Sequence, residues 1–233
     1  MNILKEIIDV WKGKTFVDAV MNDFVKMSNE TKRMYDMVIT YILKHKKIKD
    51  LDKKIYEDDI FVNKSERKIR KRLAEHLAVQ HNINIGMTLI MMSIVKDAER
   101  IGDYCKNLFQ VYEKVLKDKK KFNSKHPYYK VIKGVALDNL SLIDSTLKAF
   151  KQSDVTLAQD VMDKAYHIGH KCEDIILDIA NSKLKTNDAV ALALIVRFFK
   201  RIAAHLSNIA SSVIYPVHRI DYSLKNLKNN KKD

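Results

Sequence analysis

The sequence has very few of the residues from which turns are built. Glycine occurs five times and proline twice in 233 residues, whereas the two together make up roughly 12% of an average protein. Sheet-rich folds need a turn about every ten residues, and those turns rely on glycine and proline. Their scarcity argues against a barrel, a sandwich or a Rossmann fold. We therefore expect an all-α protein.

Long apolar runs and cysteines are scarce as well. No apolar run approaches the ~20 residues that a membrane-spanning helix needs. Residues 1–16 carry acidic side chains inside their apolar stretch and no small-residue cleavage site, so we expect no signal peptide. The two cysteines, Cys105 and Cys172, lie far apart in the chain. Without a disulfide framework, the reduced cytoplasm is the expected compartment.

Charge, in contrast, is abundant and mostly positive. Lys and Arg number 43 against 29 Asp and Glu, which gives a formal net charge of +14. This balance favours nucleic acid, an anionic membrane or an acidic partner without choosing among them. The basic stretches 64–72 and 117–125 are not interleaved with aromatic residues in the way that single-strand nucleic-acid binders are, and no helix-turn-helix or zinc-finger spacing is present. An anionic inner membrane leaflet is the functional interpretation that we prefer, and a merely solvated face is the alternative.

The hydrophobic pattern predicts two successive sets of three helices. Apolar residues recur every three or four positions, as on one face of an α-helix. A basic run that leads to the first proline, at 117–127, separates the two sets. We therefore expect an N-terminal domain over 1–120 and a C-terminal domain over 121–233. In the first set, the helices are predicted near 17–43, near 51–80 and from the connection at 81–88 to about 115. In the second set, they are predicted near 128–151, 155–182 and 187–215.

A short repeat supports this division. Residues 100–108 read RIGDYCKNL and residues 201–209 read RIAAHLSNI, so that Arg, Ile and Asn recur at the same places. Both stretches fall at the same point of the third helix in their set. The repeat predicts two tandem three-helix bundles related by pseudo-symmetry.

Acidic residues at helical spacing suggest a metal site in the first bundle. Glu99 and Asp103 stand four residues apart and share one helix face. Asp59 and Asn63 have the same spacing in the preceding helix, with Glu66 one turn further on. Antiparallel packing of the two helices would turn Asp59 and Asn63 toward Glu99 and Asp103 around one cavity. Glu66 is then the fifth candidate ligand. Carboxylate and amide oxygens suit Mg²⁺, Mn²⁺, Ca²⁺ or oxygen-ligated iron.

A simpler interpretation of the same residues stays open. Acidic pairs at this spacing are common on solvated helices. The carboxylates around residue 100 would then pair with their basic neighbours and say nothing about function. The acidic residues concerned are Asp97, Glu99 and Asp103, and the basic ones are Lys96, Arg100 and Lys106.

At this motif the sequence resembles a known family. The stretch AERIGDYCKNL at 98–108 is similar to the ERIGD-x-x-x-N-I signature of the PhoU family, and D-x-x-x-N-x-x-E at 59–66 resembles that family's second-helix acidic motif. The resemblance implies two tandem three-helix bundles. It also implies a regulatory protein that restrains phosphate uptake and phosphate-starvation signalling through a phosphate transporter and a membrane sensor histidine kinase. Some members bind iron, zinc or other metals through paired acidic motifs.

The resemblance also implies which residues hold metal and which do not. By position, Glu99 and Asp103 match one acidic motif, and Asp59 and Asn63 match the other. Lys200 stands at the place of Glu99 in the second half, where Ala204, Ala165 and Gly169 replace the remaining acidic positions. We therefore expect one metal site, for iron, zinc, manganese or magnesium, in the N-terminal half only. In the second half we expect Lys200 to pair with Glu173 or Asp174.

The preferred function is thus a regulator or adaptor of phosphate transport with no catalytic residues. We expect it in the cytoplasm, peripheral to the inner membrane, bound to a phosphate transporter or a sensor kinase and to no specific nucleic acid. The pattern leaves a homodimer open. One alternative is a carboxylate-bridged metal enzyme or metal-storage bundle, although the predicted signature helices lack the Glu-x-x-His motifs typical of such sites. Another is a basic nucleic-acid-binding helical protein.

Overall fold

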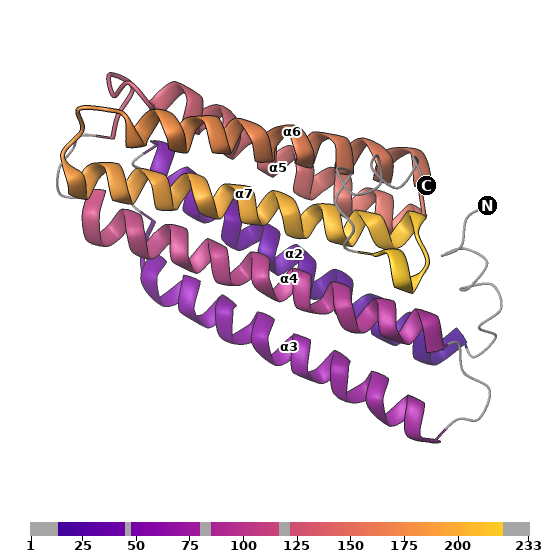
Figure 1. The fold of residues 1–233 in the computed structure, drawn as a ribbon. Coiled ribbons are helices and arrows are strands. Elements are labelled where there is room, and N and C mark those ends of the chain that lie inside the picture. The colour runs from indigo at the N-terminus through magenta and orange to yellow at the C-terminus, as the bar shows by residue number, and fades with distance from the viewer. Residues whose placement is uncertain (1–13, 45–47, 80–84, 117–121, 221–233) are drawn as a thin grey trace, which may run out of the picture.

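The computed structural model describes residues 14–44, 48–79, 85–116 and 122–220, and six long helices make up most of them (Figure 1). The described residues form no strand, and the all-α prediction is confirmed. The predicted helix limits agree with the observed ones to within a few residues wherever both ends are described. The helices are α2 Lys14–Lys44, α3 Leu51–Val79, α4 Ile85–Val111, α5 Tyr129–Gln152, α6 Val155–Ala180 and α7 Thr186–Ile214.

Short irregular turns extend two of these helices. A π-helical turn, Tyr112–Leu116, continues α4, and a 3₁₀ turn, Val217–Arg219, follows α7. The predicted breaks at 45–54, 81–88 and 117–127 lie partly outside the described residues. The N-terminal segment 1–13 and the tail 221–233 lie wholly outside them.

The α5–α6 corner shows how the sequence ends one helix and starts the next. Ser153 adopts a left-handed conformation with φ 49°, and its backbone N–H reaches back to the last turn of α5. The side chain of Asp154 then accepts a hydrogen bond of 2.9 Å from the backbone N–H of Leu157. A carboxylate in this N-cap position satisfies a backbone donor that the helix itself leaves free. Two residues thus suffice for the reversal.

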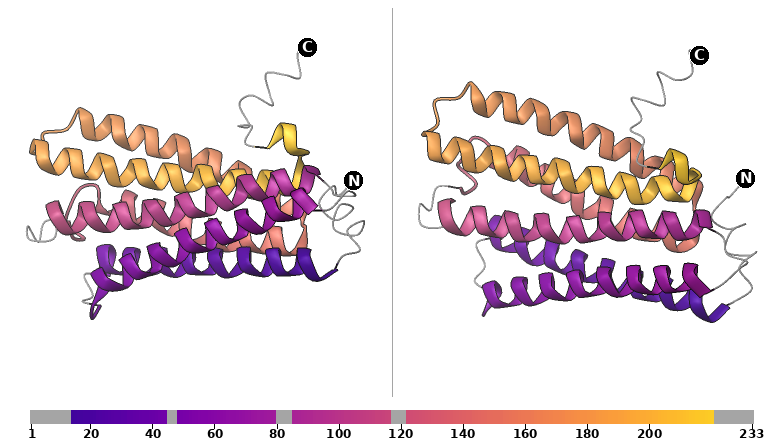
Figure 2. Two further views of the ribbon diagram at one scale, coloured as in Figure 1. Left: turned by 90° about the horizontal axis from the view of Figure 1, so that it is seen from below. Right: turned by 60° about the horizontal axis from the view of Figure 1, so that its bottom comes forward.

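The helices form two three-helix bundles that pack side by side. Helices α2, α3 and α4 contact one another and form the first bundle, and α5, α6 and α7 form the second in the same way (Figures 1 and 2). Between the bundles, α4 lies along α7 and α2 touches α5. Helix α3 lies at the edge of the molecule. The architecture is the predicted pair of tandem bundles. The domain limits 1–120 and 121–233 stay a prediction.

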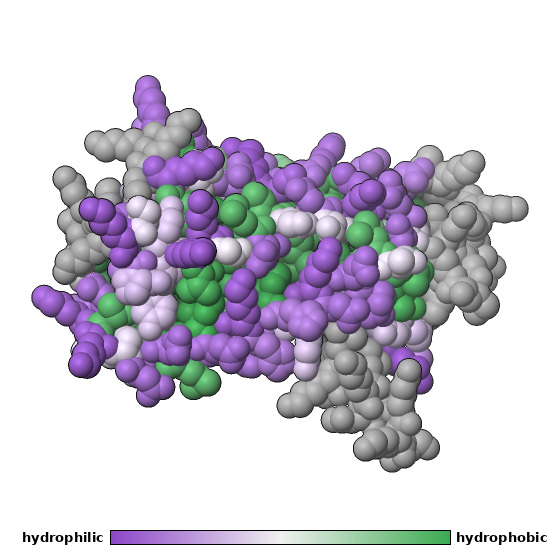
Figure 3. Space-filling view, turned by 90° about the horizontal axis from the view of Figure 1, so that it is seen from above, coloured by the Kyte–Doolittle hydropathy of each residue, from purple (hydrophilic) through white to green (hydrophobic). Residues whose placement is uncertain are grey.

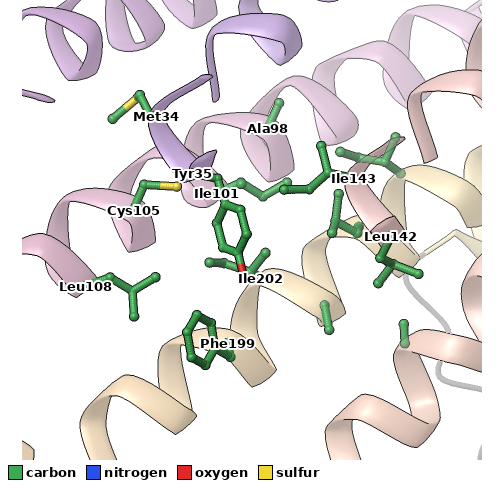
Figure 4. Packing of buried hydrophobic residues seen from close by; sticks show 14 of the residues in the cluster. Met34, Tyr35, Ala98, Ile101, Cys105, Leu108, Leu142, Ile143, Phe199 and Ile202 are labelled. Carbon is green, nitrogen blue, oxygen red and sulfur yellow. The ribbon is translucent and has the colours of Figure 1, made fainter. Parts of the chain in front are cut away.

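The two bundles share one continuous hydrophobic core. The rings of Phe24 in α2 and Phe150 in α5 lie 4.9 Å apart. Tyr35 of α2 is fully buried, its hydroxyl donates a 2.9 Å hydrogen bond to the carbonyl of Ala136 in α5, and its ring meets Phe199 of α7 edge-on at 6.4 Å (Figure 4). These contacts cross from one bundle to the other, so each bundle covers part of its partner's apolar surface.

The surface above α5 and α6 is mainly polar. On the face above α5 and α6, hydrophilic side chains alternate with strips of hydrophobic ones (Figure 3). Within the described residues, no helix is both long enough and apolar enough to cross a membrane.

Candidate functional site

Helices α3 and α4 run antiparallel, as the metal-site prediction required. Lys106 of α4 contacts Asp59 of α3, and one turn further along α4 the amide of Gln110 donates a 2.9 Å hydrogen bond to the hydroxyl of Tyr56, which lies earlier in α3. Residue numbers therefore rise in one helix as they fall in the other. This register brings Asp59 to the same level as Asp103.

Asp59 and Asp103 converge on the ammonium group of Lys106. The Lys106 Nζ atom lies 2.8 and 2.7 Å from the two carboxylate oxygens of Asp59 and 3.3 Å from Oδ1 of Asp103. Burial alone would lower the pKa of Lys106, but its hydrogen bonds with Asp59 and the two negative charges outweigh that effect and raise the pKa. The lysine therefore remains charged at neutral pH between the two helices.

The other two predicted carboxylate ligands lie on the same two helices but have cations of their own. Glu66 is buried and accepts a 3.0 Å hydrogen bond from Arg70, one turn away in α3. Glu99 is also buried, and its Oε2 atom lies 2.8 Å from the Nζ atom of Lys96 without accepting a hydrogen bond from a described residue. Asn63 is half-buried. The simpler interpretation, ion pairs with basic neighbours, thus describes how Glu66 and Glu99 are neutralised.

Asp103 has a second basic neighbour, since Arg100 reaches its Oδ2 atom at 3.1 Å. Within the described ranges, no three His, Cys, Asp or Glu side chains gather closely enough to hold a metal ion. Of the five predicted ligands, the structure brings Asp59 and Asp103 to one point. The metal site stays a prediction.

The glycine of the motif has a packing role. A Cβ atom added to Gly102 would lie 3.2 Å from Val62 Cγ1 and 3.6 Å from Thr31 Cγ2. The first of these distances is tighter than an ordinary carbon–carbon contact. Gly102 thus lets α4 approach α3 and α2 closely, which positions Asp103 and Lys106 next to Asp59.

A polar cluster between the bundles was missed by sequence reasoning. Asp97 of α4 is buried, and its Oδ1 atom lies 2.7 Å from Nδ1 of His205 and 3.0 Å from Nδ2 of Asn208, both in α7. Asn208 belongs to the degenerate copy of the motif, and the ring of Tyr104 stacks on His205 at 5.7 Å. The two motif copies therefore meet where the antiparallel helices α4 and α7 pack together.

Another buried carboxylate that sequence reasoning missed, Asp58, faces α2. It forms an ion pair with Arg33, which also pairs with Glu30. Burial, together with a hydrogen bond and charge repulsion from Glu30, raises the pKa of Asp58 from its ordinary value of 3.8 to about 6, although Arg33 opposes the change. The sequence could have indicated that Asp58 is buried, because it falls on the apolar face of α3 with Ile55 and Val62.

We expect Asp58 to make folding stability depend on pH in a way that an Asp58→Asn variant does not. Because folding raises this pKa, the folded protein retains a proton between about pH 4 and pH 6 that the unfolded chain releases. The stability that Asp58 contributes is therefore full below pH 4 and is lost as the pH rises through 6. Urea unfolding of both proteins from pH 4 to 7 measures the effect. The wild-type free energy of unfolding should fall by about 1–2 kcal/mol relative to the variant. If the free energies of unfolding of the two proteins differ by the same amount at every pH from 4 to 7, the prediction is contradicted.

The corresponding region of the second bundle holds the predicted lysine pair. Lys200 of α7 forms an ion pair with Glu173 of α6, and His170 lies 3.3 Å from the other oxygen of Glu173. The prediction that Lys200 neutralises an acidic residue of the preceding helix is confirmed, with Glu173 as the partner.

Comparison with known proteins identifies the family. The PhoU domain matches this chain twice, over residues 24–111 and over residues 138–213. The chain belongs to the PhoU family. The two matches fall on the two helix bundles, and the first contains all five predicted ligands while the second contains Lys200. The tandem repeat inferred from RIGDYCKNL and RIAAHLSNI is thereby confirmed.

Two relatives are named for phosphate transport. The phosphate-specific transport system accessory protein PhoU homolog of Synechocystis sp. is 29% identical over 172 residues, which cover 70% of this chain and 73% of that protein. PhoU homolog 1 of Thermotoga maritima is 26% identical over 175 residues, covering 71% and 72%. Both are named as accessory proteins rather than as enzymes.

Solved structures show the same fold. The crystal structure of PhoU from Pseudomonas aeruginosa has a TM-score of 0.78 and 18% sequence identity, and the match covers 87% of this chain and 97% of that one. PhoU from Streptococcus pneumoniae, a phosphate transport system regulatory protein, gives a TM-score of 0.72 at 16% identity and covers 85% and 93%. At such identities the likeness concerns the fold. The family placement makes this chain a PhoU-like accessory protein of phosphate transport.

Proposed function

We propose that this PhoU protein restrains phosphate uptake at the cytoplasmic face of the inner membrane by binding a phosphate transporter or its sensor histidine kinase. Membership of the PhoU family and the names of the relatives support the link to phosphate transport. The observation that carries the membrane location is the outer face of α3, which combines exposed apolar side chains with basic ones. Binding would act by shifting the conformational balance of the membrane partner.

The outer face of α3 departs from an ordinary solvated helix. Ile60 is 52% exposed, Phe61 45% and Tyr56 44%, so three large, mainly apolar side chains stand clear of the bundle in the first half of α3. Lys64 and Arg67 lie one and two turns beyond Ile60 on the same face. Both are exposed and form no ion pair with any other described residue.

A shallow groove adjoins this face on the side of α2. Its volume is about 380 Å³, and Phe61, Lys26, Lys64 and Lys68 contribute to its lining. Lys68 is partly neutralised, because its Nζ atom lies 3.2 Å from Asp23. Lys26 and Lys64 have no such acidic neighbour among the described residues.

Such a surface fits the anionic headgroups of a membrane. A basic side chain near an anionic leaflet contributes about 1 kcal/mol of attraction. Apolar side chains that enter the boundary between headgroups and acyl chains add a hydrophobic contribution. Neither alone holds a protein firmly, but the two together would concentrate the chain where a membrane-embedded partner resides.

Vesicle flotation tests the α3 face. We expect the full chain to float with vesicles that contain about one third anionic lipid and not with neutral vesicles, and the bound fraction to fall several-fold at high salt. The double variant Lys64→Glu/Arg67→Glu should lose most of this binding. Lys164→Glu, which reverses an exposed charge on α6, is the matched control and should bind as the wild type does. Equal binding by all three proteins would contradict the role of α3.

A test in cells addresses the regulatory role itself. Deletion of the gene should raise phosphate uptake in phosphate-rich medium, and the wild-type chain should restore restraint. The α3 double variant should restore it poorly. Unchanged uptake after deletion would refute the proposed function, whereas full restoration by the double variant would refute only the docking face.

No further observation favours the metal-storage, enzymatic or nucleic-acid alternatives over this function. A homodimer stays a prediction.

A further inference from the structure

The cation site between α3 and α4 has an occupant that belongs to the chain itself. Lys106 reaches across the helix interface, and its ammonium group lies within 3.3 Å of three carboxylate oxygens, two from Asp59 and one from Asp103. This is the place at which the sequence predicted a metal ion. The exposed fractions of the side chains are 20% for Lys106, 13% for Asp59 and 25% for Asp103, so water screens the group only in part.

The residues as they lie do not fit a metal ion. Divalent cations in oxygen sites need several ligands at about 2.0–2.6 Å. Asp59 directs both of its oxygens to Lys106, and the buried Glu66 accepts a hydrogen bond from Arg70. The buried Glu99 has the charge of Lys96 beside it at 2.8 Å, although its Oε2 atom accepts no hydrogen bond from a described residue. A metal ion bound by Asp59 and Asp103 would also lie next to the positive charge of Lys106 unless that side chain moved away.

We propose that Lys106 is the resident cation of this site and takes the place of a metal ion between α3 and α4. A single ammonium offsets the repulsion between Asp59 and Asp103, because it donates hydrogen bonds to both. It also links the edge helix α3 to α4, which itself packs along α7. The bundle therefore needs no metal ion to hold its acidic motif in place.

The second bundle shows the same arrangement independently. Lys200 stands at the place of the acidic Glu99 in the motif repeat, and it pairs with Glu173 of the preceding helix. In each bundle, a lysine of the third helix thus neutralises a carboxylate of the second. Lys106 and Lys200 occupy different positions of the motif, yet each one pairs with a carboxylate of the preceding helix.

The first test is elemental analysis of the full chain, purified without an affinity tag and then incubated with iron, zinc or manganese before gel filtration. We expect much less than one metal ion per chain. A metal ion that stays bound in near-equal amount to the wild type, and is lost on Asp59→Asn/Asp103→Asn substitution, would overturn the proposal and restore the predicted metal site.

The second test removes the lysine. Lys106→Ala should lower the melting temperature by about 3–8 °C. Lys71→Ala should have little effect, because Lys71 is exposed and, among the residues that the structure describes, pairs with the exposed Glu75 alone. About 1 mM Mn²⁺ should raise the melting temperature of Lys106→Ala by several degrees and leave the wild type unchanged, since the vacated carboxylates then accept a metal ion.

A merely structural lysine would not confer that response to metal. Equal responses of the wild type and Lys106→Ala, whether both rise or neither does, would overturn the proposal. The elemental analysis of the wild type decides the question alone if the variant fails to fold.

Discussion

Replacing Tyr35 with alanine should destabilise both bundles together and lower the free energy of unfolding by about 3–5 kcal/mol. Tyr35 is fully buried at the junction of the bundles, where its ring meets Phe199 and its hydroxyl donates to Ala136. Truncation removes a large apolar contact and leaves a cavity that helices from both bundles would have to close. Urea unfolding followed by circular dichroism measures the loss.

Two further variants separate the contributions of the ring and the hydroxyl of Tyr35. Tyr35→Phe keeps the ring and removes one buried hydrogen bond, so we expect a loss of about 1 kcal/mol. Tyr166→Ala removes a tyrosine that is 38% exposed on α6 and should cost far less than Tyr35→Ala. Because the core is continuous, the unfolding transition of Tyr35→Ala should stay single. Two separate transitions, of which one keeps the wild-type midpoint, would show that the bundles unfold independently and would contradict this prediction.

The sequence determines the helices well because their signals are local. Apolar residues at three- and four-residue steps mark a buried stripe whatever the partner helix is. The scarcity of glycine and proline removes most competing structures. The ends are predicted to within a few residues, and the α5–α6 corner follows from Ser153 and Asp154, whose backbone and side-chain preferences act over a few residues only.

The candidate site was predictable only in part, because ion pairing depends on helix register. The spacing of Asp103 and Lys106 is visible in the sequence, but Asp59 joins them from a residue 47 positions away. Glu66 was predicted as a ligand beside Asp59, whereas the structure pairs it with Arg70 one turn further on in the same helix, a partner whose spacing is visible in the sequence. Asp58 has the same limitation as Asp59, since its partners in α2 set its pKa.

Asp97 shows the limit most clearly. The simpler interpretation placed it among the surface carboxylates that pair with basic neighbours, whereas the residue is 7% exposed and contacts α7. Its partner His205 lies 108 positions along the chain. Only the packing of α4 along α7 brings them together, and a pattern within one helix carries no information on that packing.

Asp97 should therefore contribute more to stability than any acidic residue on the outer faces. We expect Asp97→Ala to lower the free energy of unfolding by about 2–4 kcal/mol, because it leaves His205 and Asn208 without their acceptor at a partly buried interface. Asp163→Ala, which removes an exposed carboxylate from α6, is the matched control and should change stability by less than about 0.5 kcal/mol.

A double-mutant cycle assigns this loss to the contact between the bundles. His205→Ala alone should cost less than Asp97→Ala, since Asn208 would still donate to the carboxylate. If the two side chains interact as their 2.7 Å separation indicates, the double variant should be more stable than the sum of the single losses predicts, by about 1–2 kcal/mol. Losses that add to within about 0.5 kcal/mol would show that Asp97 and His205 do not stabilise each other, and would leave the hydrogen bond from Asn208 as the polar link between Asp97 and α7.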